Sequence, residues 1–254
     1  MVIGLDLFKE HFEKYSDNYV LIGGSAADIF LEEVGLEFRV TKDLDIVLCV
    51  EALNREFVQA FWNFIKLGKY SQCQISTGKR LFYRFYNPEI SAFPKMLELF
   101  SRVPDALDLK EGSKLTPIPV DDSVSSLSAI LLDDDYYRFI IGNRILVNGI
   151  SLVNAEAIIP LKSYAFLNLI EERKIDTRVQ SQHIKKHKND ILRLVALLDF
   201  REQIEVSNRI RLDLIKTLEL LETQPVDLKS IGISSKEVNF SDILAKMRRF
   251  YGLN

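Results

Sequence analysis

The sequence predicts an α/β (α+β) fold over the first part of the chain, followed by an α-helical C-terminal region. Short apolar runs of strand length alternate with amphipathic helical segments over the first 153 residues. From residue 154 onward the apolar residues recur at helical spacing. With 254 residues, 47% of them hydrophobic, the chain is long enough to bury a core. We therefore expect an α/β domain over residues 1–153 and a helical domain over residues 154–254 that closes a cleft.

The elements expected in the first domain begin with a helix and a short strand that ends in two glycines. Apolar residues at helical spacing predict helices, and apolar runs bounded by turn residues predict strands. The predicted helices are residues 5–15, 25–33 and 54–68. The predicted strands are residues 19–22, 38–40, 44–50, 73–75, 79–86, 96–101 and 150–152. Residues 103–135 are expected to be irregular, and residues 136–141 and 144–147 to form a hairpin across Gly142-Asn143. The helices of the second domain are expected at residues 154–172, 183–200, 201–222 and 241–250.

The overall composition is that of an ordinary globular protein. The net charge of -3 argues against a general electrostatic attraction to nucleic acid. The two cysteines, Cys49 and Cys73, have no metal-ligand spacing and are expected to be buried thiols. No apolar run approaches the ~18 residues that a membrane span needs. We expect a cytoplasmic protein without a membrane partner.

Two aspartates stand out at the start of the strand predicted at 44–50. Asp43 and Asp45 are two residues apart, so on an extended chain their side chains point to one face, and those of Leu44 and Ile46 to the other. Like charges on one strand face repel each other unless a cation lies between them. Mg²⁺ binds through one or two carboxylates and completes its shell with water and phosphate. The pattern therefore predicts a Mg²⁺ or Mn²⁺ site.

A glycine turn precedes this strand and is expected to bind phosphate. Gly23 and Gly24 would let the backbone approach a triphosphate, and Ser25 would donate its N–H and its hydroxyl. A helix N-terminus after such a turn favours an anion. Together with the two aspartates, the turn predicts a site for a metal–nucleotide complex. The Gly-x-Gly-x-x-Gly pattern of a Rossmann dehydrogenase is absent from this turn.

The order of strand, Gly-Gly-Ser turn, helix and Asp-Leu-Asp strand resembles the nucleotidyltransferase superfamily. Arg39 and Thr41, ahead of Asp43, resemble the Arg-x-Thr-x-Asp-x-Asp form of the AbiEii-type toxin nucleotidyltransferases. In the helical half, Lys162 resembles the helix lysine of that branch, and Lys188 with Asp190 resembles its later helix motif. The resemblance covers residues 20–200. It implies a nucleotidyltransferase-like mixed sheet with flanking helices.

The resemblance also implies roles for single residues of the first domain. Asp43, Asp45 and Glu98 would be metal ligands and catalytic residues, with Glu98 as the third carboxylate because it is a lone acid in an apolar strand. The alternatives for Glu98 are exposure to solvent or pairing with an arginine such as Arg84. Arg39 and Thr41 would belong to the nucleotide-binding set. Arg39 would orient an aspartate or form a surface salt bridge.

The resemblance implies roles for three residues of the helical half as well. Lys162 would reach the β- and γ-phosphates as a point charge, and the alternative is a solvated lysine. Lys188 would join the nucleotide-binding residues, and Asp190 the catalytic residues. Their alternative is an exposed helix face, with Asp190 paired to a lysine one turn away.

These observations favour an enzyme, a metal-dependent nucleotidyltransferase that transfers NMP from an NTP to a hydroxyl acceptor. The acceptor would be an RNA end such as that of a tRNA, a protein or a small molecule. The resemblance implies a toxin of a toxin–antitoxin or phage-defence pair, with a cognate antitoxin as a partner. One alternative is a degenerate member of the family that binds a nucleotide or a partner protein. A second alternative is a glycosyltransferase that uses Asp-x-Asp, against which the early glycine turn argues.

Overall fold

A computed structural model describes residues 2–33, 35, 37–38, 41–72, 83–103, 115–117, 128–199, 202–233 and 239–253. It shows a mixed α/β arrangement followed by a helical C-terminal region, which confirms the predicted fold class. The chain divides into two compact units, Met1–Asn154 and Ala155–Asn254. Whether the helical unit closes a cleft stays a prediction.

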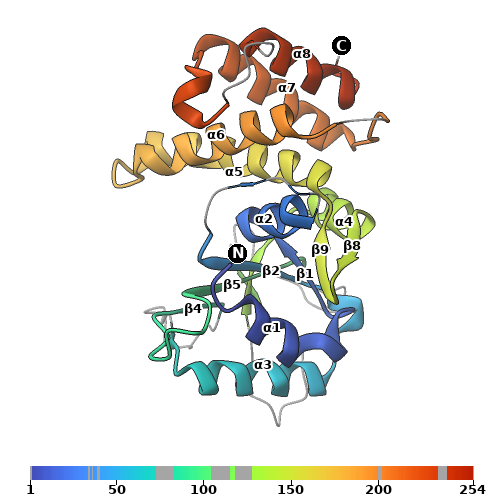
Figure 1. Cartoon of the computed structure of the whole chain (residues 1–254), viewed down its shortest axis with the longest axis vertical. Coiled ribbons are helices and arrows are strands. Elements are labelled where there is room, and N and C mark those ends of the chain that lie inside the picture. Colours follow the sequence, from blue (N-terminus) through green and yellow to red (C-terminus); the bar gives the residue numbers. More distant parts are fainter. Residues whose placement is uncertain are drawn as a thin grey trace. The chain divides into compact units, whose positions relative to one another are not determined.

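The first unit is built on one mixed sheet (Figure 1). Its strands are β1 (Tyr19–Ile22), β2 (Asp43–Leu48), β3 (Ser71–Gln72), β4 (Arg84–Tyr86), β5 (Met96–Ser101), β6 (Leu115–Pro117), β7 (Ser128–Leu131), β8 (Arg144–Val147) and β9 (Ile150–Val153). The main order is β3-β4-β5-β2-β1-β9-β8, and β7 pairs with both β5 and β6. The central strand β2 runs antiparallel to β1 and parallel to β5.

Helices flank this sheet and make up the second unit. The helices of the first unit are α1 (Leu5–Phe12), α2 (Gly23–Glu33), α3 (Arg55–Gly68) and α4 (Asp134–Gly142), with 3-10 turns η1 (Glu13–Tyr15) and η2 (Val50–Ala52). Those of the second unit are α5 (Ala155–Ile175), α6 (Ser181–Leu197), α7 (Asn208–Thr223) and α8 (Phe240–Phe250), with the 3-10 turn η3 (Leu228–Ile231). The predicted helix at 201–222 begins later, at Asn208, because the Ser207 side chain accepts a hydrogen bond from the N–H of Ile210 and caps it there.

An aromatic layer joins α1 and α3 to one face of the sheet, below it in Figure 1. The ring of Phe8 in α1 lies 5.3 Å from that of Tyr19 in β1, and Phe61 in α3 lies 5.5 Å from Phe85 in β4. Tyr19 pairs in register with Leu48, so the even-numbered residues of β2 share this buried face. The odd-numbered residues, including Asp43 and Asp45, therefore lie on the opposite face.

The hairpin predicted across Gly142-Asn143 is wrong. Residues 136–141 belong to α4, which begins where the Asp133 side chain accepts a hydrogen bond from the N–H of Asp135. Tyr136, Tyr137 and Ile140 are buried along one side of this helix, so tertiary burial outweighs the β propensity of its aromatic residues. The hairpin joins β8 to β9 instead. Its turn, Asn148-Gly149, has φ values of 50° and 82°, as a type I′ turn requires.

Several sequence predictions fall outside the described residues. They include the strand at 73–75, the first part of the strand at 79–86, Cys73, Arg39 and much of the irregular stretch at 103–135. Cys49 is described, and it is a buried free thiol as predicted. Within the described part of the chain, no helix has both the length and the apolar character that crossing a bilayer would require.

Candidate active site

The sheet register brings three of the predicted carboxylates onto one face. In the parallel pair of β2 and β5, Asp45 lies opposite Glu98, and Asp43 lies opposite Met96. Residues opposite each other in a ladder point to the same side, so Glu98 shares the face of Asp43 and Asp45. Both aspartates are half-buried, whereas Leu44 and Ile46 between and after them are buried. The structure thus has the alternation that the Asp-Leu-Asp pattern predicts.

Gly23 and Asp45 approach each other closely at the end of β1. Gly23 is the first residue of α2 and has a φ of 73°, a left-handed conformation that favours glycine. A Cβ atom added at Gly23 would clash with Oδ2 of Asp45. The carboxylate of Asp45 therefore packs against the N-terminus of α2, where the helix dipole favours negative charge. Glycine at this position satisfies both the backbone conformation and the close contact.

Glu98 is paired with Arg84 from the neighbouring strand β4. The two residues lie opposite each other in the antiparallel ladder, and Glu98 is only 9% exposed. The Nε of Arg84 donates a hydrogen bond of 2.6 Å to Oε1 of Glu98, and a terminal guanidinium nitrogen contacts the same oxygen. Solvent exposure and pairing with an arginine are the alternatives that the sequence leaves for Glu98, and the structure shows the pairing with Arg84.

The remaining residues of the predicted phosphate site are largely buried. Gly24 and Ser25 are buried in the first turn of α2, and the Ser25 hydroxyl donates a 3.3 Å hydrogen bond to the Ile22 carbonyl. That hydroxyl is therefore already used within the protein, whereas the first backbone N–H groups of a helix have no intrahelical acceptor. Thr41, which lies two residues before Asp43, is also buried.

The carboxylates of this face fit a hard cation. Asp43 and Asp45 offer oxygen ligands from one strand face, which is the donor chemistry of Mg²⁺ or Mn²⁺. The described residues contain no group of three or more His, Cys, Asp or Glu placed to hold a metal ion together. The arrangement thus suits an ion that takes one or two protein carboxylates and fills its other positions with water and substrate oxygens.

Lys162 and Asp190 come together inside the helical unit. Lys162 lies on α5 and Asp190 on α6, and the Lys162 Nζ donates a 2.7 Å hydrogen bond to Oδ2 of Asp190. The side chains are 4% and 0% exposed, and Arg193 lies 3.6 Å from the other carboxylate oxygen. Lys188 is half-buried, and burial lowers its pKa, with a further contribution from Lys185. The catalytic and phosphate-binding roles of these residues stay predictions.

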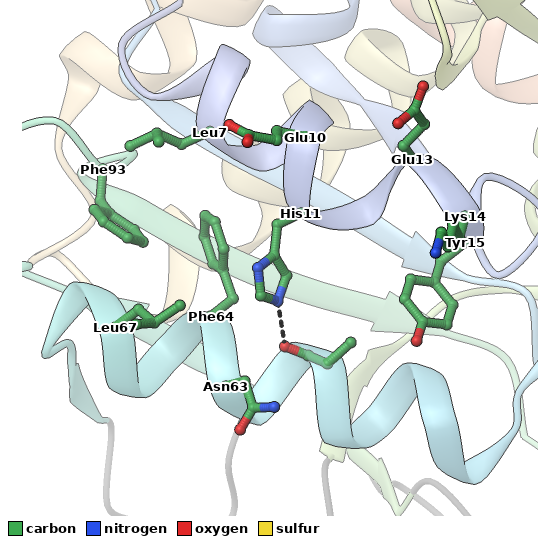
Figure 2. Close-up of a pocket in the computed structure, with 11 residues that line it drawn as sticks. Leu7, Glu10, His11, Glu13, Lys14, Tyr15, Asn63, Phe64, Leu67 and Phe93 are labelled. Atoms are coloured by element: carbon green, nitrogen blue, oxygen red, sulfur yellow. Dashed lines mark hydrogen bonds between the residues drawn. The ribbon is translucent and has the colours of Figure 1, made fainter.

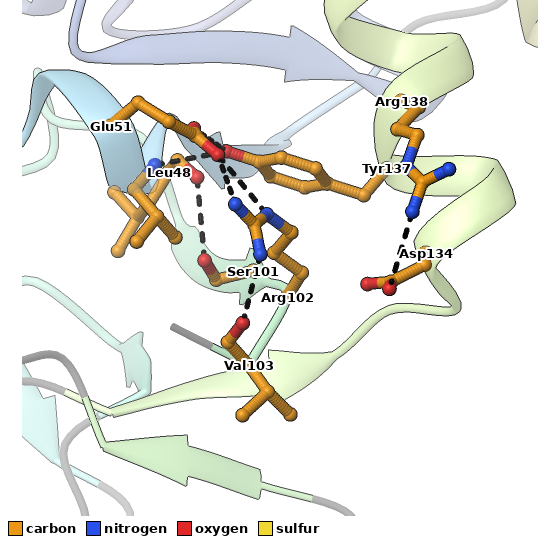
Figure 3. Close-up of polar contacts among 9 residues, drawn as sticks. Leu48, Glu51, Ser101, Arg102, Val103, Asp134, Tyr137 and Arg138 are labelled. Carbon is orange, nitrogen blue, oxygen red and sulfur yellow. Dashed lines mark hydrogen bonds and ion pairs between the residues drawn. The ribbon is translucent and has the colours of Figure 1, made fainter. Parts of the chain in front are cut away.

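A second polar cluster, which the sequence analysis missed, lies at the other end of β2 and β5 (Figure 3). The Tyr137 hydroxyl donates a 2.7 Å hydrogen bond to Glu51 and accepts one of 2.9 Å from the backbone N–H of Val50. Arg102 pairs with Glu51 and lies 5.4 Å from the centre of the Tyr137 ring. The cluster borders a cavity of about 590 Å³. Its members come from distant parts of the chain, so no local pattern indicates it.

Replacing Tyr137 by phenylalanine should lower the free energy of unfolding by about 1–2 kcal/mol, because it removes partners from both Glu51 and the N–H of Val50. Burial alone would raise the pKa of Glu51, but hydrogen bonds from Arg102 and Tyr137 lower it below its usual 4.5. A depressed carboxyl pKa adds stability above the unfolded-state value, and this stability is lost as the pH falls through the folded-state value.

Urea unfolding at neutral pH and at about pH 3 checks this, because the difference between wild type and Tyr137→Phe should shrink as the pH falls through the lowered pKa of Glu51. The control is Tyr83→Phe, a half-buried tyrosine outside this cluster. An effect of Tyr137→Phe that is equal at both pH values would contradict the proposed coupling to Glu51.

A groove between α1 and α3 lies on the aromatic face (Figure 2). Asp43, Asp45 and Glu98 lie on the opposite face of the sheet. It has a volume of about 510 Å³ and is lined by Phe64, Leu67 and Phe93 among others. His11 points across it, and its Nε2 donates a 2.8 Å hydrogen bond to the Ala60 carbonyl. None of the predicted site residues lines this groove. Because His11 belongs to α1 and Ala60 to α3, this hydrogen bond links the two helices.

The comparisons with known proteins give only distant likenesses. No protein-family model and no curated protein matches the sequence. Among solved structures, the Megavirus polyadenylate synthase is 9% identical to this chain, with a TM-score of 0.37. The match covers 87% of this chain and 36% of the viral protein. JHP933 from Helicobacter pylori is 12% identical, with a TM-score of 0.30, and the match covers 98% of this chain and 89% of JHP933. This chain thus spans little more than a third of the viral enzyme. Neither likeness by itself assigns an activity.

Proposed function

We propose that this chain is a metal-dependent nucleotidyltransferase that transfers NMP from an NTP to a hydroxyl acceptor. The observation that carries the proposal is the placement of Asp43, Asp45 and Glu98 on one sheet face, with Asp45 packed against Gly23 at the start of α2. Acidic metal ligands and the N-terminus of a helix are thereby neighbours. A metal-bound triphosphate needs both kinds of group, since its oxygens bind cations and backbone N–H groups.

The proposed reaction forms one phosphorus–oxygen bond and breaks another. The acceptor hydroxyl oxygen attacks the α-phosphorus of the NTP, the bond to the β-phosphate oxygen breaks, and pyrophosphate leaves. The hydroxyl proton passes to one of the carboxylates of Asp43, Asp45 and Glu98 on this sheet face. A divalent cation held by Asp43 and Asp45 would stabilise the charge that develops on the phosphate oxygens. The two aspartates therefore act by binding this ion and fixing its position.

Phosphate binding is proposed at the first turn of α2. The backbone N–H groups of Gly24 and Ser25 are suitable donors because the first turn of a helix leaves its N–H groups without intrahelical acceptors. The Ser25 hydroxyl is a weaker candidate, since it donates to Ile22. Arg39 and Thr41 are proposed as additional nucleotide-binding residues on the strength of the motif. Lys162 would need to leave Asp190 before its ammonium group could reach a phosphate.

The biological setting is proposed from the motifs alone. The Arg-x-Thr-x-Asp-x-Asp pattern supports a cytoplasmic toxin of a toxin–antitoxin or phage-defence pair, with Mg²⁺ or Mn²⁺ as cofactor and a cognate antitoxin as partner. The acceptor class that we propose is a hydroxyl on an RNA end, a protein or a small molecule.

One observation favours a second candidate function, a nucleotide-binding protein without transferase activity. The Glu98 carboxylate, which would be the third acid of the site, is held by Arg84. Such a protein would bind an NTP and release no pyrophosphate. Pyrophosphate release therefore separates the two candidates, whereas nucleotide binding does not.

Thermal unfolding with each NTP, with and without Mg²⁺, tests the proposed site. A ligand at a hundred times its dissociation constant adds about 2.7 kcal/mol, which should raise the melting temperature by about 5–11 °C in a chain of this size. We expect a rise that requires Mg²⁺ and disappears in Asp43→Asn/Asp45→Asn. The matched control is Glu10→Gln/Glu13→Gln, which removes two exposed carboxylates from the opposite side of the sheet.

Any of three results would contradict the proposal. No rise with any NTP would exclude an NTP site, and a rise with UDP-sugars alone would favour the glycosyltransferase alternative. A rise that persists in Asp43→Asn/Asp45→Asn would place the nucleotide elsewhere in the protein.

A further inference from the structure

We infer that Arg84 takes the place of a second divalent cation at Glu98, so that the site binds one divalent cation, through Asp43 and Asp45. This inference rests on the proposed function and specifies its metal requirement. Nucleotidyl transfer is commonly served by two metal ions that share carboxylate ligands. In this chain the positive charge beside Glu98 comes from Arg84 on the neighbouring strand β4.

The three strands place Arg84, Glu98 and Asp45 in one row across the sheet. Arg84 of β4 lies opposite Glu98 of β5, and Glu98 lies opposite Asp45 of β2. All three side chains therefore leave the same face of the sheet. Glu98 has a guanidinium group on one side and the predicted metal ligand on the other. A cation shared between Asp45 and Glu98 would lie next to the Arg84 guanidinium.

The contact between Arg84 and Glu98 satisfies a largely buried carboxylate. Two guanidinium nitrogens contact Oε1 of Glu98, one of them at 2.6 Å. The Glu98 side chain is 12% exposed and the Arg84 side chain 42% exposed. A buried carboxylate is costly without a charged partner, and an arginine supplies that charge through strong, oriented hydrogen bonds. The Arg84 side chain therefore supplies the positive charge that the Glu98 carboxylate needs.

The charge of Arg84 makes a second metal ion at Glu98 unfavourable. The guanidinium group stays protonated at any working pH, so its charge cannot be removed to admit the ion. Two positive groups that share Oε1 would repel each other in a site partly shielded from water. A second ion on either oxygen of Glu98 would lie next to the Arg84 guanidinium group, which is bound to Oε1 of the same carboxylate.

The number of ions bound can be measured without a nucleotide. Titration of the full chain with Mn²⁺, followed by the electron paramagnetic resonance signal of free Mn²⁺, should give one bound ion per chain. Asp43→Asn/Asp45→Asn should remove this ion. Glu98→Gln should leave one ion with a dissociation constant within about threefold of wild type, because the inference assigns Glu98 to Arg84 and not to the ion. The glutamine retains a carbonyl oxygen that accepts hydrogen bonds from Arg84, so this variant should fold.

Substitutions of Arg84 provide the positive test. Arg84→Gln removes the charge and should allow a second Mn²⁺ to bind, and this second ion should disappear in Arg84→Gln/Glu98→Gln. Arg84→Lys keeps the charge and should stay at one ion, which makes it the matched control. Circular dichroism spectra verify that each variant is folded before its ion count is compared.

The possible failures are distinguishable. Two Mn²⁺ ions in the wild type, or loss of binding in Glu98→Gln, would overturn the inference about Arg84 and leave the proposed function standing. Binding that persists in Asp43→Asn/Asp45→Asn would instead remove the proposed metal site, and the inference with it.

Discussion

Replacing Asp190 by alanine is expected to lower the free energy of unfolding of the helical unit by about 3–5 kcal/mol. Asp190 is fully buried and accepts a 2.7 Å hydrogen bond from the Lys162 ammonium, which is itself 4% exposed. Without the carboxylate, a positive charge remains buried between α5 and α6 without its main counter-charge. A buried ion that loses its partner costs far more than a surface pair. This is the largest effect on stability that we expect from a single substitution.

Urea unfolding followed by circular dichroism measures this loss. The matched control is Glu171→Ala on α5, which breaks an exposed pair with Lys174 and should cost less than about 0.5 kcal/mol. The double variant Lys162→Met/Asp190→Leu should recover most of the loss, since apolar side chains of similar volume can replace a buried pair. A loss below about 1 kcal/mol in Asp190→Ala would contradict the buried pair.

The same double variant tests the functional role predicted for Lys162 and Asp190. It is expected to keep the helical unit folded while it removes both charges. If the two residues only hold α5 against α6, nucleotide-dependent stabilisation and NMP transfer should survive in this variant. If Lys162 also contacts a phosphate, both should fall although the protein stays folded.

Replacing Asp43 or Asp45 by asparagine is expected to reduce NMP transfer by at least about a hundredfold. Metal-bound charge stabilises the transition state by several kcal/mol, and each 1.4 kcal/mol corresponds to a factor of ten in rate. Asparagine keeps the size of the side chain but weakens the ligand. Circular dichroism verifies that each variant is folded before its transfer rate is compared with that of wild type.

Transfer of label from α-³²P-labelled NTPs to tRNA or protein, with pyrophosphate release measured in parallel, provides the measurement. The control variant, Glu10→Gln/Glu13→Gln, should retain full activity because these exposed residues of α1 and η1 lie on the far side of the sheet. A folded Asp43→Asn variant with unchanged transfer would refute the proposed catalytic site.

Short-range patterns in the sequence predict the elements that form the candidate site. The strand of Asp43 and Asp45, the glycine turn at Gly23 and the helix after it are close in the chain, so their spacing already determines which side chains share a face. The strand of Glu98 is also visible as an apolar run with a single acid. Local periodicity fails at residues 136–141, where burial of Tyr136 and Tyr137 makes a helix from residues with strand propensity.

Local patterns in the sequence are enough to predict a glycine turn, two aspartates on one strand face and a helical second half. Tertiary structure alone decided the partners of the other charged groups. Strand register places Glu98 between Arg84 and Asp45, helix packing joins Lys162 to Asp190, and Tyr137 meets Glu51 across more than 80 residues of chain. These pairs depend on which distant segments pack together, because a charged group buried by that packing must find its partner there.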